Sequence, residues 1–99
     1  MGQPIALVTG GSLRLGKAIG QYLAKNGCLV YIHYNQSQDA AVLLKEELNA
    51  KGFRAEILQA DLSKEEDIVS MLAQVEERSG RLDMLVNNLF FLTIVWQTI

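Results

Sequence analysis

The sequence predicts an α/β fold, in which a doubly wound parallel sheet of about four strands is covered by three helices. The main observation is an alternation of two patterns along the chain. Short apolar runs, typical of strands buried on both faces, occupy residues 5–8, 28–33, 53–59 and 84–86. Amphipathic stretches with helical spacing lie between them, at about 15–26, 37–50 and 63–79. Strands and helices that alternate at these lengths imply right-handed crossovers and a parallel sheet with helices on both faces.

The first helix is expected to begin near Leu15 and to end before Gly27, where a residue with positive φ is favoured. Its predicted core face consists of Ala18, Ile19, Tyr22 and Leu23. The second helix is expected to have Ser37 as its N-cap and to reach about Ala50.

The third helix carries a different start signal. The segment from Ser63 to Glu66 fits a capping box, in which the serine hydroxyl accepts from the backbone N–H of Glu66. The residues that follow at core spacing are Ile68, Met71, Leu72 and Val75. In the strand before it, Phe53, Ala55 and Ile57 alternate and are expected to share one side.

Composition narrows the classes of function. The chain has 99 residues, 49% of them hydrophobic and 20% charged, which suits one soluble globular domain. With a net charge of −2 and no run of Lys or Arg, neither a nucleic acid nor an anionic membrane surface is an expected partner. The single cysteine, Cys28, cannot form a disulfide within the chain and is expected to be a buried small hydrophobe.

The two ends of the chain indicate the cellular compartment in which the protein is expected. The N-terminus lacks a basic region followed by an apolar stretch, so no signal peptide is expected. The longest apolar stretch, 89–96, is far shorter than the ~20 residues that span a bilayer. We therefore expect a cytoplasmic protein with no membrane segment.

The junction between the first strand and the first helix is rich in glycine, and it carries the clearest functional signal. Gly10, Gly11, Ser12 and Gly16 cluster at the carboxyl end of a predicted parallel strand, where ligands bind in doubly wound sheets. Glycines allow a pyrophosphate to approach the backbone, and the N–H groups of the helix start attract an anion. The alternative is a glycine-rich connection that binds nothing.

A P-loop is a second alternative for this junction. Residues 11–17 fit the first seven positions of G-x-x-x-x-G-K, but the eighth position requires a Ser or Thr hydroxyl for magnesium. Ala18 stands there and has no ligand atom. The pattern therefore favours a dinucleotide over a magnesium–nucleotide complex, and no metal site is predicted.

Three motifs in order resemble the short-chain dehydrogenase/reductase family. Thr9-Gly10 followed by Gly16 is similar to its T-G-x-x-x-G-x-G cofactor motif. Ala60-Asp61-Leu62 is similar to the segment after the third strand, and the segment from Leu82 to Asn88 is similar to L-D-x-L-V-N-N on the fourth. The resemblance covers residues 4–88, the N-terminal part of the family. It implies a Rossmann-type doubly wound parallel sheet, truncated here to about four strands and three helices.

One departure from the motif points to a subgroup. Arg14 stands where the middle glycine is expected, and T-G-x-x-x-R-x-G resembles the pteridine reductases and their close relatives. The segment from His33 to Ser37 is also similar to their pattern. A pteridine-reductase-like protein is therefore expected.

The resemblance implies a set of cofactor-binding residues. Gly10, Ser12 and Gly16 would line the pyrophosphate, while Arg14 and Leu15 would contact the cofactor through side chain or backbone. Around the adenosine, the implied residues are Asp61, accepting from the adenine amino group, Leu62 beside the ring, and Asn87. The alternative for Asp61 is that it simply begins the turn before the third helix.

The end of the second strand predicts the cofactor. Tyr34, Asn35 and Ser37 belong to a stretch without an acid before Asp39, whereas a carboxylate there would bind the ribose hydroxyls of NAD. Neutral donors would accept a 2′-phosphate, and Arg14 adds positive charge. NADP (NADPH) is therefore favoured over NAD as the dinucleotide partner.

Catalytic residues are missing from this sequence. The family uses a Tyr-x-x-x-Lys motif, but Tyr22, Tyr31 and Tyr34 are followed four positions later by Asn26, Asn35 and Gln38. We therefore expect the cofactor-binding fragment of an NADP-dependent oxidoreductase that reduces a pterin, a folate or a carbonyl compound, and whose full-length form is compatible with a homo-oligomer. The alternatives are a non-catalytic dinucleotide-binding module and a non-functional truncated product.

The last eleven residues do not fit the family pattern. Residues 1–88 are expected to form the dinucleotide-binding half, and 89–99 an atypical uncharged tail. After Asn88 the family expects Ala and then Gly or Ser, and a shifted reading frame could restore a family-like continuation. A frameshift is therefore one hypothesis, and a divergent short protein is the other. The tail could also pair with the fourth strand, whose apolar edge would otherwise favour aggregation.

Overall fold

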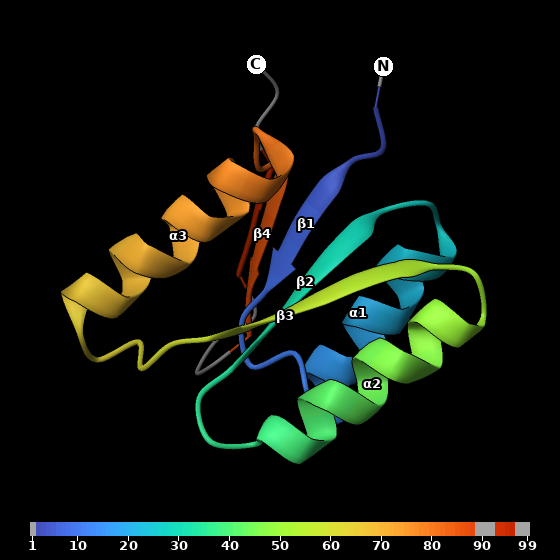
Figure 1. The fold of residues 1–99 in the computed structure, drawn as a ribbon, viewed down its shortest axis with the longest axis horizontal. Helices are drawn as coiled ribbons and strands as arrows, with labels where there is room; N and C mark the ends of the chain where they lie inside the picture. Colours follow the sequence, from blue (N-terminus) through green and yellow to red (C-terminus); the bar gives the residue numbers. More distant parts are fainter. Residues whose placement is uncertain (1, 89–92, 97–99) are drawn as a thin grey trace.

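The computed structural model describes residues 2–88 and 93–96 and contains one five-stranded sheet. The strand order is β3-β2-β1-β4-β5 (Figure 1). Neighbouring strands among the first four pair in parallel, and β5 runs antiparallel to β4. The strands are β1 Ile5–Val8, β2 Leu29–Tyr34, β3 Arg54–Gln59, β4 Met84–Asn87 and β5 Thr93–Trp96.

Three helices cover the two faces of this sheet. They are α1 Arg14–Lys25, α2 Gln38–Ala50 and α3 Glu65–Ser79. Helices α1 and α2 pack on one face and α3 on the other (Figure 1). The predicted fold class is confirmed: the described residues form four parallel strands and three helices in a Rossmann-like arrangement. The fifth strand that the tail could form is also present, with Thr93 opposite Asn87 and Trp96 opposite Met84.

Alternation along the central strands separates the core into two clusters. Val8, Ile32 and Leu44 belong to the cluster under α1 and α2, and Leu7 and Met71 belong to the cluster under α3. Successive side chains of a strand point to opposite faces, so a continuous apolar run is needed where both faces are covered. Phe53, Ala55 and Ile57 share the first cluster, as predicted. Cys28 is buried, and this burial raises the pKa of its thiol.

The predicted core face of α1 was partly wrong. Ile19 and Leu23 pack on the first cluster, but Tyr22 is 66% exposed and Ala18 is also exposed. The residues of α1 that are buried are Gly16, Gly20 and Ala24, which recur every four positions. Small side chains at this spacing allow the helix to lie close to the sheet, so the contact follows the small residues and leaves the tyrosine at the surface.

The predicted capping box was also wrong. Lys64 is the N-cap of α3, and no side chain caps that helix. The Ser63 hydroxyl instead donates to Asp61 Oδ1 at 2.7 Å, a charge-assisted hydrogen bond that holds this side chain in the turn before the helix. Ser37 does occupy the N-cap of α2, although its side chain makes no capping hydrogen bond. In α3, Met71 and Val75 are buried as predicted, whereas Leu72 is 40% exposed.

None of the described helices is long and apolar enough to cross a bilayer.

Candidate functional site

The carboxyl ends of β1 and β4 lie side by side, at the place where the helices change from one face of the sheet to the other. The helix after β1 covers one face of the sheet, and the helix that leads into β4 covers the other (Figure 1). In open α/β sheets, a crevice opens at such a switch point and ligands bind there. The glycine-rich loop, residues 9–13, lies at this point.

The glycine-rich loop folds back tightly over the start of α1. Gly10 has a φ of 60°, in the left-handed region that glycine adopts at little cost. A Cβ on Gly16 would overlap the carbonyl oxygen of Gly10 and lie 2.6 Å from Nδ2 of Asn88. A Cβ on Gly11 would lie 2.9 Å from the carbonyl oxygen of Val8. Glycine is therefore required here by close packing of the loop as well as by any approach of a phosphate.

Three residues at the end of β4 and directly after it hold one side of this loop. The Thr9 hydroxyl accepts from the backbone N–H of Asn88 at 2.9 Å and lies 3.0 Å from Oδ1 of Asn87, to which it can donate. The Thr9 N–H donates to the carbonyl of Val86 at 2.9 Å, and Nδ2 of Asn88 lies 3.4 Å from the Gly10 carbonyl oxygen. The loop is thus bonded to β4 through backbone and side chain together.

His33 holds the other side of the loop. The residue is 1% exposed at the end of β2. Its Nδ1 accepts from the N–H of Gly10 at 2.9 Å, and its carbonyl oxygen accepts from the N–H of Gly11 at 3.0 Å. Its Nε2 lies 2.8 Å from the carbonyl oxygen of Ala60. Burial lowers the pKa of His33, although the hydrogen bond to Ala60 works in the opposite direction.

Arg14 adopts a backbone conformation that explains why a glycine is expected at its position. Its φ is 53°, and it is the one non-glycine residue in the described part of the chain with a positive φ. An L residue in the left-handed region costs about 1 kcal/mol or more. The Arg14 side chain is exposed at the first position of α1, close to the loop. Arginine at this position therefore adds a charge at the expense of backbone strain.

A cavity of about 510 Å³ lies beside the loop, between the strand ends and α3. Asp61, Leu62 and Asn87, all predicted to surround the adenosine, line it together with Thr9 and Asn35. Its remaining wall is largely apolar and includes Ile68, Met71, Leu72 and Leu85. A flat aromatic ring with a polar edge fits a cavity of this character.

The Asp61 carboxylate also has a local role in the turn before α3. Oδ1 accepts from the hydroxyl and the backbone N–H of Ser63, at 2.7 and 3.0 Å. These bonds lower the pKa of Asp61, the hydroxyl having the larger effect. The Asp61 N–H donates to Oδ2 of Asp67 at 2.8 Å. Asp61 therefore forms the turn before α3 and also lines the cavity, and its contact with adenine stays a prediction.

The predicted 2′-phosphate region lies after β2 and is more open. Ser37 is half-buried in a hollow of about 420 Å³ that is also lined by Leu13, Gln36 and Asp39. Asn35 is exposed and accepts from Nε2 of Gln59. Tyr34 is buried in the cluster under α1 and α2, so this placement does not support a cofactor contact by its side chain. Arg14 is not among the residues that line this hollow, and Asp39 places a carboxylate in it.

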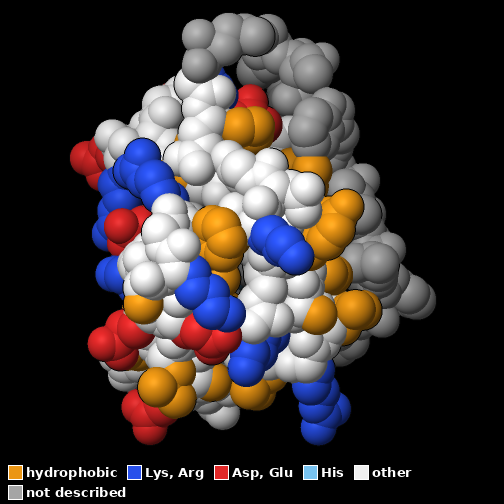
Figure 2. Space-filling model, turned by 90° about the vertical axis from the view of Figure 1, so that its right-hand side faces the viewer, with side chains coloured by type: hydrophobic (Ala, Val, Ile, Leu, Met, Phe, Trp, Pro, Cys, Tyr) orange, Lys and Arg blue, Asp and Glu red, His pale blue; other side chains and the backbone are white. Residues whose placement is uncertain are grey.

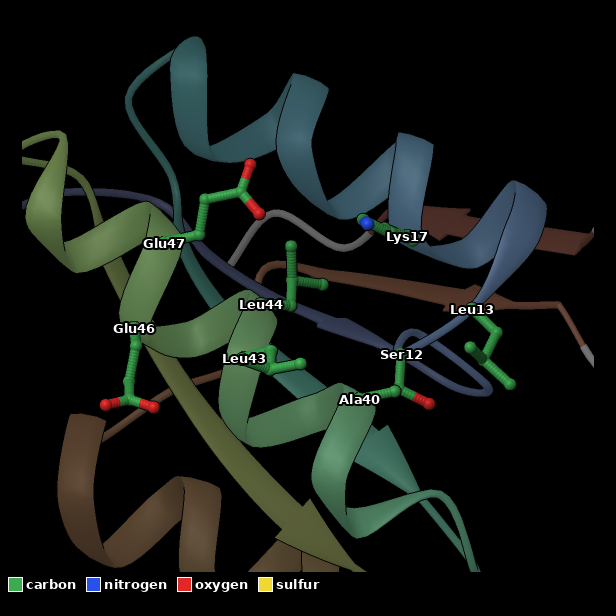
Figure 3. A pocket seen from close by; sticks show the side chains of 8 residues that line it. All are labelled: Ser12, Leu13, Lys17, Ala40, Leu43, Leu44, Glu46 and Glu47. Carbon is green, nitrogen blue, oxygen red and sulfur yellow. The ribbon is translucent and has the colours of Figure 1, made fainter.

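Ser12 and Leu15 lie away from the cavity of Asp61. Ser12 is buried and lines a groove of about 540 Å³ between α1 and α2 (Figure 3). In that groove Glu47 points from α2 toward α1, and Lys17 belongs to the facing helix (Figure 3). Leu15 is 54% exposed on α1. Figure 2 shows Lys and Arg side chains lying among acidic and hydrophobic ones on the face it views, rather than in one continuous basic patch.

Comparison with known proteins agrees with this geometry. Residues 4–89 match the family model described as short chain dehydrogenase. The chain belongs to this family. It is 42% identical over 84 residues to a short-chain dehydrogenase/reductase homolog, YusS, of Bacillus subtilis, a match that covers 85% of this chain and 77% of that protein. It is 39% identical over 83 residues to the 3-oxoacyl-[acyl-carrier-protein] reductase FabG of Staphylococcus epidermidis, covering 84% of this chain and 34% of that one.

Solved structures of the same family superpose well. The NADP complex of FolM alternative dihydrofolate reductase 1 from Brucella canis has a TM-score of 0.81 and 39% identity, over 89% of this chain and 35% of that chain. A blue fluorescent protein from a metagenomic library, in complex with NADPH, has a TM-score of 0.83 and 35% identity, over 91% of this chain and 37% of that chain. The chain thus spans about a third of the length of FabG and of these structures. YusS, in contrast, is matched over most of its length.

Three residues of the site were not assigned to it from the sequence. In the sequence, Thr9 and Asn88 stand out only as members of two motifs, and His33 only as part of the subgroup pattern. The structure brings all three around the Gly10 backbone. The available signal was their position, because each lies at the carboxyl end of a strand next to the switch point.

Proposed function

We propose that residues 1–88 are the cofactor-binding half of an NADP-dependent oxidoreductase of the short-chain type, followed by the tail at 89–99. The observation that carries this proposal is the packing of Gly16 against the Gly10 carbonyl, which leaves the backbone at the start of α1 free of side-chain bulk. The first turn of α1 contains no acidic residue, so its N–H groups favour a pyrophosphate. Gly10 and Gly16 would line the pyrophosphate, with Ser12 and Leu15 contributing through the backbone.

The adenosine would occupy the cavity beside the loop. Asp61 would accept from the adenine amino group, and the part-buried Leu62 would pack on the ring. The bonds from Ser63 keep the Asp61 carboxyl ionised, which suits a hydrogen-bond acceptor. Asn87 would lie along the ribose from the β4 side of the same cavity.

NADP is proposed over NAD on three features of the described residues. Arg14 is exposed beside the loop, and Asn35 and Ser37 follow β2 as neutral groups that can hydrogen-bond a phosphate. Asp39 in the same hollow opposes this preference, so the discrimination is expected to be modest. The NADP and NADPH complexes of two related structures are consistent with the choice.

A pterin, a folate or a carbonyl compound is the proposed substrate class. The Arg14 variant of the motif and the likeness to FolM favour a pterin or folate, whereas FabG represents carbonyl reduction. The residues that would transfer the proton are not in this sequence, which has no Tyr-x-x-x-Lys. That absence favours a second candidate for the chain by itself, namely a dinucleotide-binding module without catalysis.

Calorimetric titration of the chain with NADP⁺ and NAD⁺ tests the proposal. Gly16→Ala should weaken binding of both by more than about tenfold, since the new Cβ collides with the loop that holds the pyrophosphate. Gly20→Ala is the matched control in the same helix, because its Cβ would have only Val30 Cγ1 as a near neighbour, at 3.8 Å. Equal binding by the two variants, or no binding by the unmodified folded chain, would contradict the proposal. An insoluble chain would instead support the non-functional product.

A further inference from the structure

His33 joins two parts of the site that are far apart in the sequence. Its ring bridges the N–H of Gly10, in the glycine loop, and the carbonyl oxygen of Ala60, at the end of β3. The next residue, Asp61, donates its N–H to Asp67 in the first turn of α3. A continuous path of hydrogen bonds therefore runs from the loop, through the imidazole, to the turn that carries the adenosine cavity.

The two hydrogen-bond partners of the His33 ring determine which of its nitrogen atoms carries a proton. A backbone N–H only donates, so Nδ1 must carry a lone pair toward Gly10. A carbonyl oxygen only accepts, so Nε2 must carry the proton toward Ala60. The arrangement is therefore satisfied by one state, the neutral imidazole protonated on Nε2. A second proton on Nδ1 would face the Gly10 N–H, and two donors cannot bond to each other.

We propose that His33 is a positioning residue for the dinucleotide. Its neutral ring holds the Gly10 amide at a fixed position relative to Ala60 and Asp61. Protonation of the ring breaks the hydrogen bond to Gly10, releases the loop and weakens dinucleotide binding. This inference rests on the proposed dinucleotide function. His33 acts through the loop backbone and is not assigned a role in the reaction.

The charged groups and the burial around His33 determine the pKa of its ring. From the β3–α3 connection, Asp61 lines the same cavity, with Asp67 bonded behind it and Lys64 close to Asp61. The parts of β1, β4 and α3 that line this cavity contribute uncharged residues, and the neighbour on its own strand, Tyr34, packs on the other cluster. By sign, the two carboxylates favour the imidazolium and Lys64 opposes it; burial has the largest effect on the pKa of His33 and lowers it, and the hydrogen bond to Ala60 raises it.

The sign of the pH dependence follows from this balance. The pKa of His33 is lowered in the folded chain, so the ring is neutral at neutral pH and the loop is held. The hydrogen bond to Gly10 is lost as the pH falls through the folded pKa, below the ordinary value of about 6.5. Dinucleotide affinity should therefore decrease on the acid side.

The first test is made on the unliganded, ¹⁵N-labelled chain by NMR. His33 is the single histidine in the sequence, so its ring nitrogens can be assigned without ambiguity. We expect Nε2 protonated and Nδ1 unprotonated at neutral pH, and a Gly10 amide resonance that shifts with the same midpoint as the ring. A proton on Nδ1 at neutral pH, or a Gly10 amide that ignores the titration, would overturn the proposal whether or not a cofactor binds.

The second test measures NADP⁺ and NAD⁺ binding as the pH is lowered from neutral to below the midpoint that the NMR titration gives for the His33 ring. The unmodified chain should lose about tenfold in affinity toward the acid end, as expected for one buried hydrogen bond. His33→Asn keeps an acceptor for Gly10 that does not titrate, so its affinity for NAD⁺ should be nearly independent of pH. His33→Phe keeps the ring shape without either bond and should bind about tenfold more weakly at neutral pH.

NAD⁺ is needed because the 2′-phosphate of NADP⁺ itself titrates near pH 6. Circular dichroism at each pH confirms that the variants are folded. If the unmodified chain and His33→Asn have the same pH profile, or His33→Phe binds as well as the unmodified chain, the positioning role is wrong. If no folded form binds any dinucleotide, the proposed function fails. The NMR result then shows separately whether the hydrogen bond between His33 and Gly10 exists.

Discussion

The two ends of the candidate cofactor site are built differently. The glycine loop is bonded on both sides, by Thr9 and Asn88 toward β4 and by His33 toward β2. The hollow after β2 is open: Ser37 makes no capping bond, and Asp39 is exposed. A pyrophosphate common to all nicotinamide dinucleotides would meet the bonded end, and a 2′-phosphate the open end. Recognition of the cofactor class is therefore expected to depend on the fold, and choice between NADP and NAD on a few exposed side chains.

The largest effect is expected at the bonded end, for Thr9→Val. The substitution keeps the shape but leaves the N–H of Asn88 without its acceptor, and it also removes the hydroxyl beside Asn87. An unsatisfied buried donor costs about 1–3 kcal/mol, so we expect unfolding at lower urea concentration and loss of binding for both dinucleotides. Thr9→Ser keeps the hydroxyl and should retain most of the stability. Unchanged stability and binding in Thr9→Val would contradict this role of the hydroxyl.

Smaller effects are expected for Arg14→Gly, which should increase stability and decrease the preference for NADP⁺. Glycine relieves the left-handed backbone at φ 53° and should raise the free energy of unfolding by about 1 kcal/mol. The same change removes the positive charge and should lower the preference for NADP⁺ over NAD⁺ by roughly fivefold, the usual scale of one exposed phosphate contact. Denaturant titration and calorimetry measure the two quantities on one sample. Arg14→Lys, which keeps both strain and charge, is the control, and unchanged selectivity in Arg14→Gly would place the 2′-phosphate elsewhere.

A still smaller effect should come from Asp39→Asn at the open end. Removal of an exposed carboxylate from the hollow should strengthen NADP⁺ binding by about twofold and leave NAD⁺ binding unchanged. The difference should shrink as salt is added, since the charges are screened. Glu46→Gln, on the same helix but outside this hollow, is the control. An equal gain in both variants would indicate only a change in net charge.

The smallest effect on binding is expected far from both ends, for Asp83→Asn. Oδ2 of Asp83 accepts hydrogen bonds from the Ile5 N–H at 2.8 Å and from Nε of Arg81 at 2.9 Å. These bonds lower the pKa of the carboxyl, and the bond from Ile5 has the largest effect. A carboxyl whose pKa is lower folded than unfolded stabilises the fold above its unfolded pKa. That stability is lost as the pH falls through the folded pKa. Asp83→Asn should therefore flatten the acid limb of a stability–pH curve without changing cofactor selectivity. An unchanged acid limb would refute this assignment.

Local patterns were sufficient to predict the scaffold and the positions of most residues proposed for the site. The four parallel strands follow from apolar runs that must be buried on both faces, and the glycine loop follows from a cluster that only a tight strand–helix junction requires. Gly10, Asp61, Leu62 and Asn87 lie at or just after strand ends, and Gly16 lies in the first turn of α1 against Gly10, as their positions in the motifs implied. These features depend on residues near one another in the chain, so the sequence carries them directly.

Other features were decided by contacts between segments distant in the sequence. The face of α1 follows the small residues that let it approach the sheet, not the apolar spacing that included Tyr22. His33 bonds to Gly10 across 23 positions, and the bond from Ser63 to Asp61, two positions away, is a local exception.

By itself, then, the sequence determined the α/β class, the order of the strands and helices, and the glycine loop, because periodicity and glycine's freedom act within a few residues. Only the tertiary structure decided which hydrogen bonds hold that loop, the tautomer of His33, the strained backbone of Arg14 and the pairing of β5 with β4. Each of these depends on where a donor, an acceptor or a free strand edge comes to lie once the sheet has assembled, and buried polar groups then take the nearest partner.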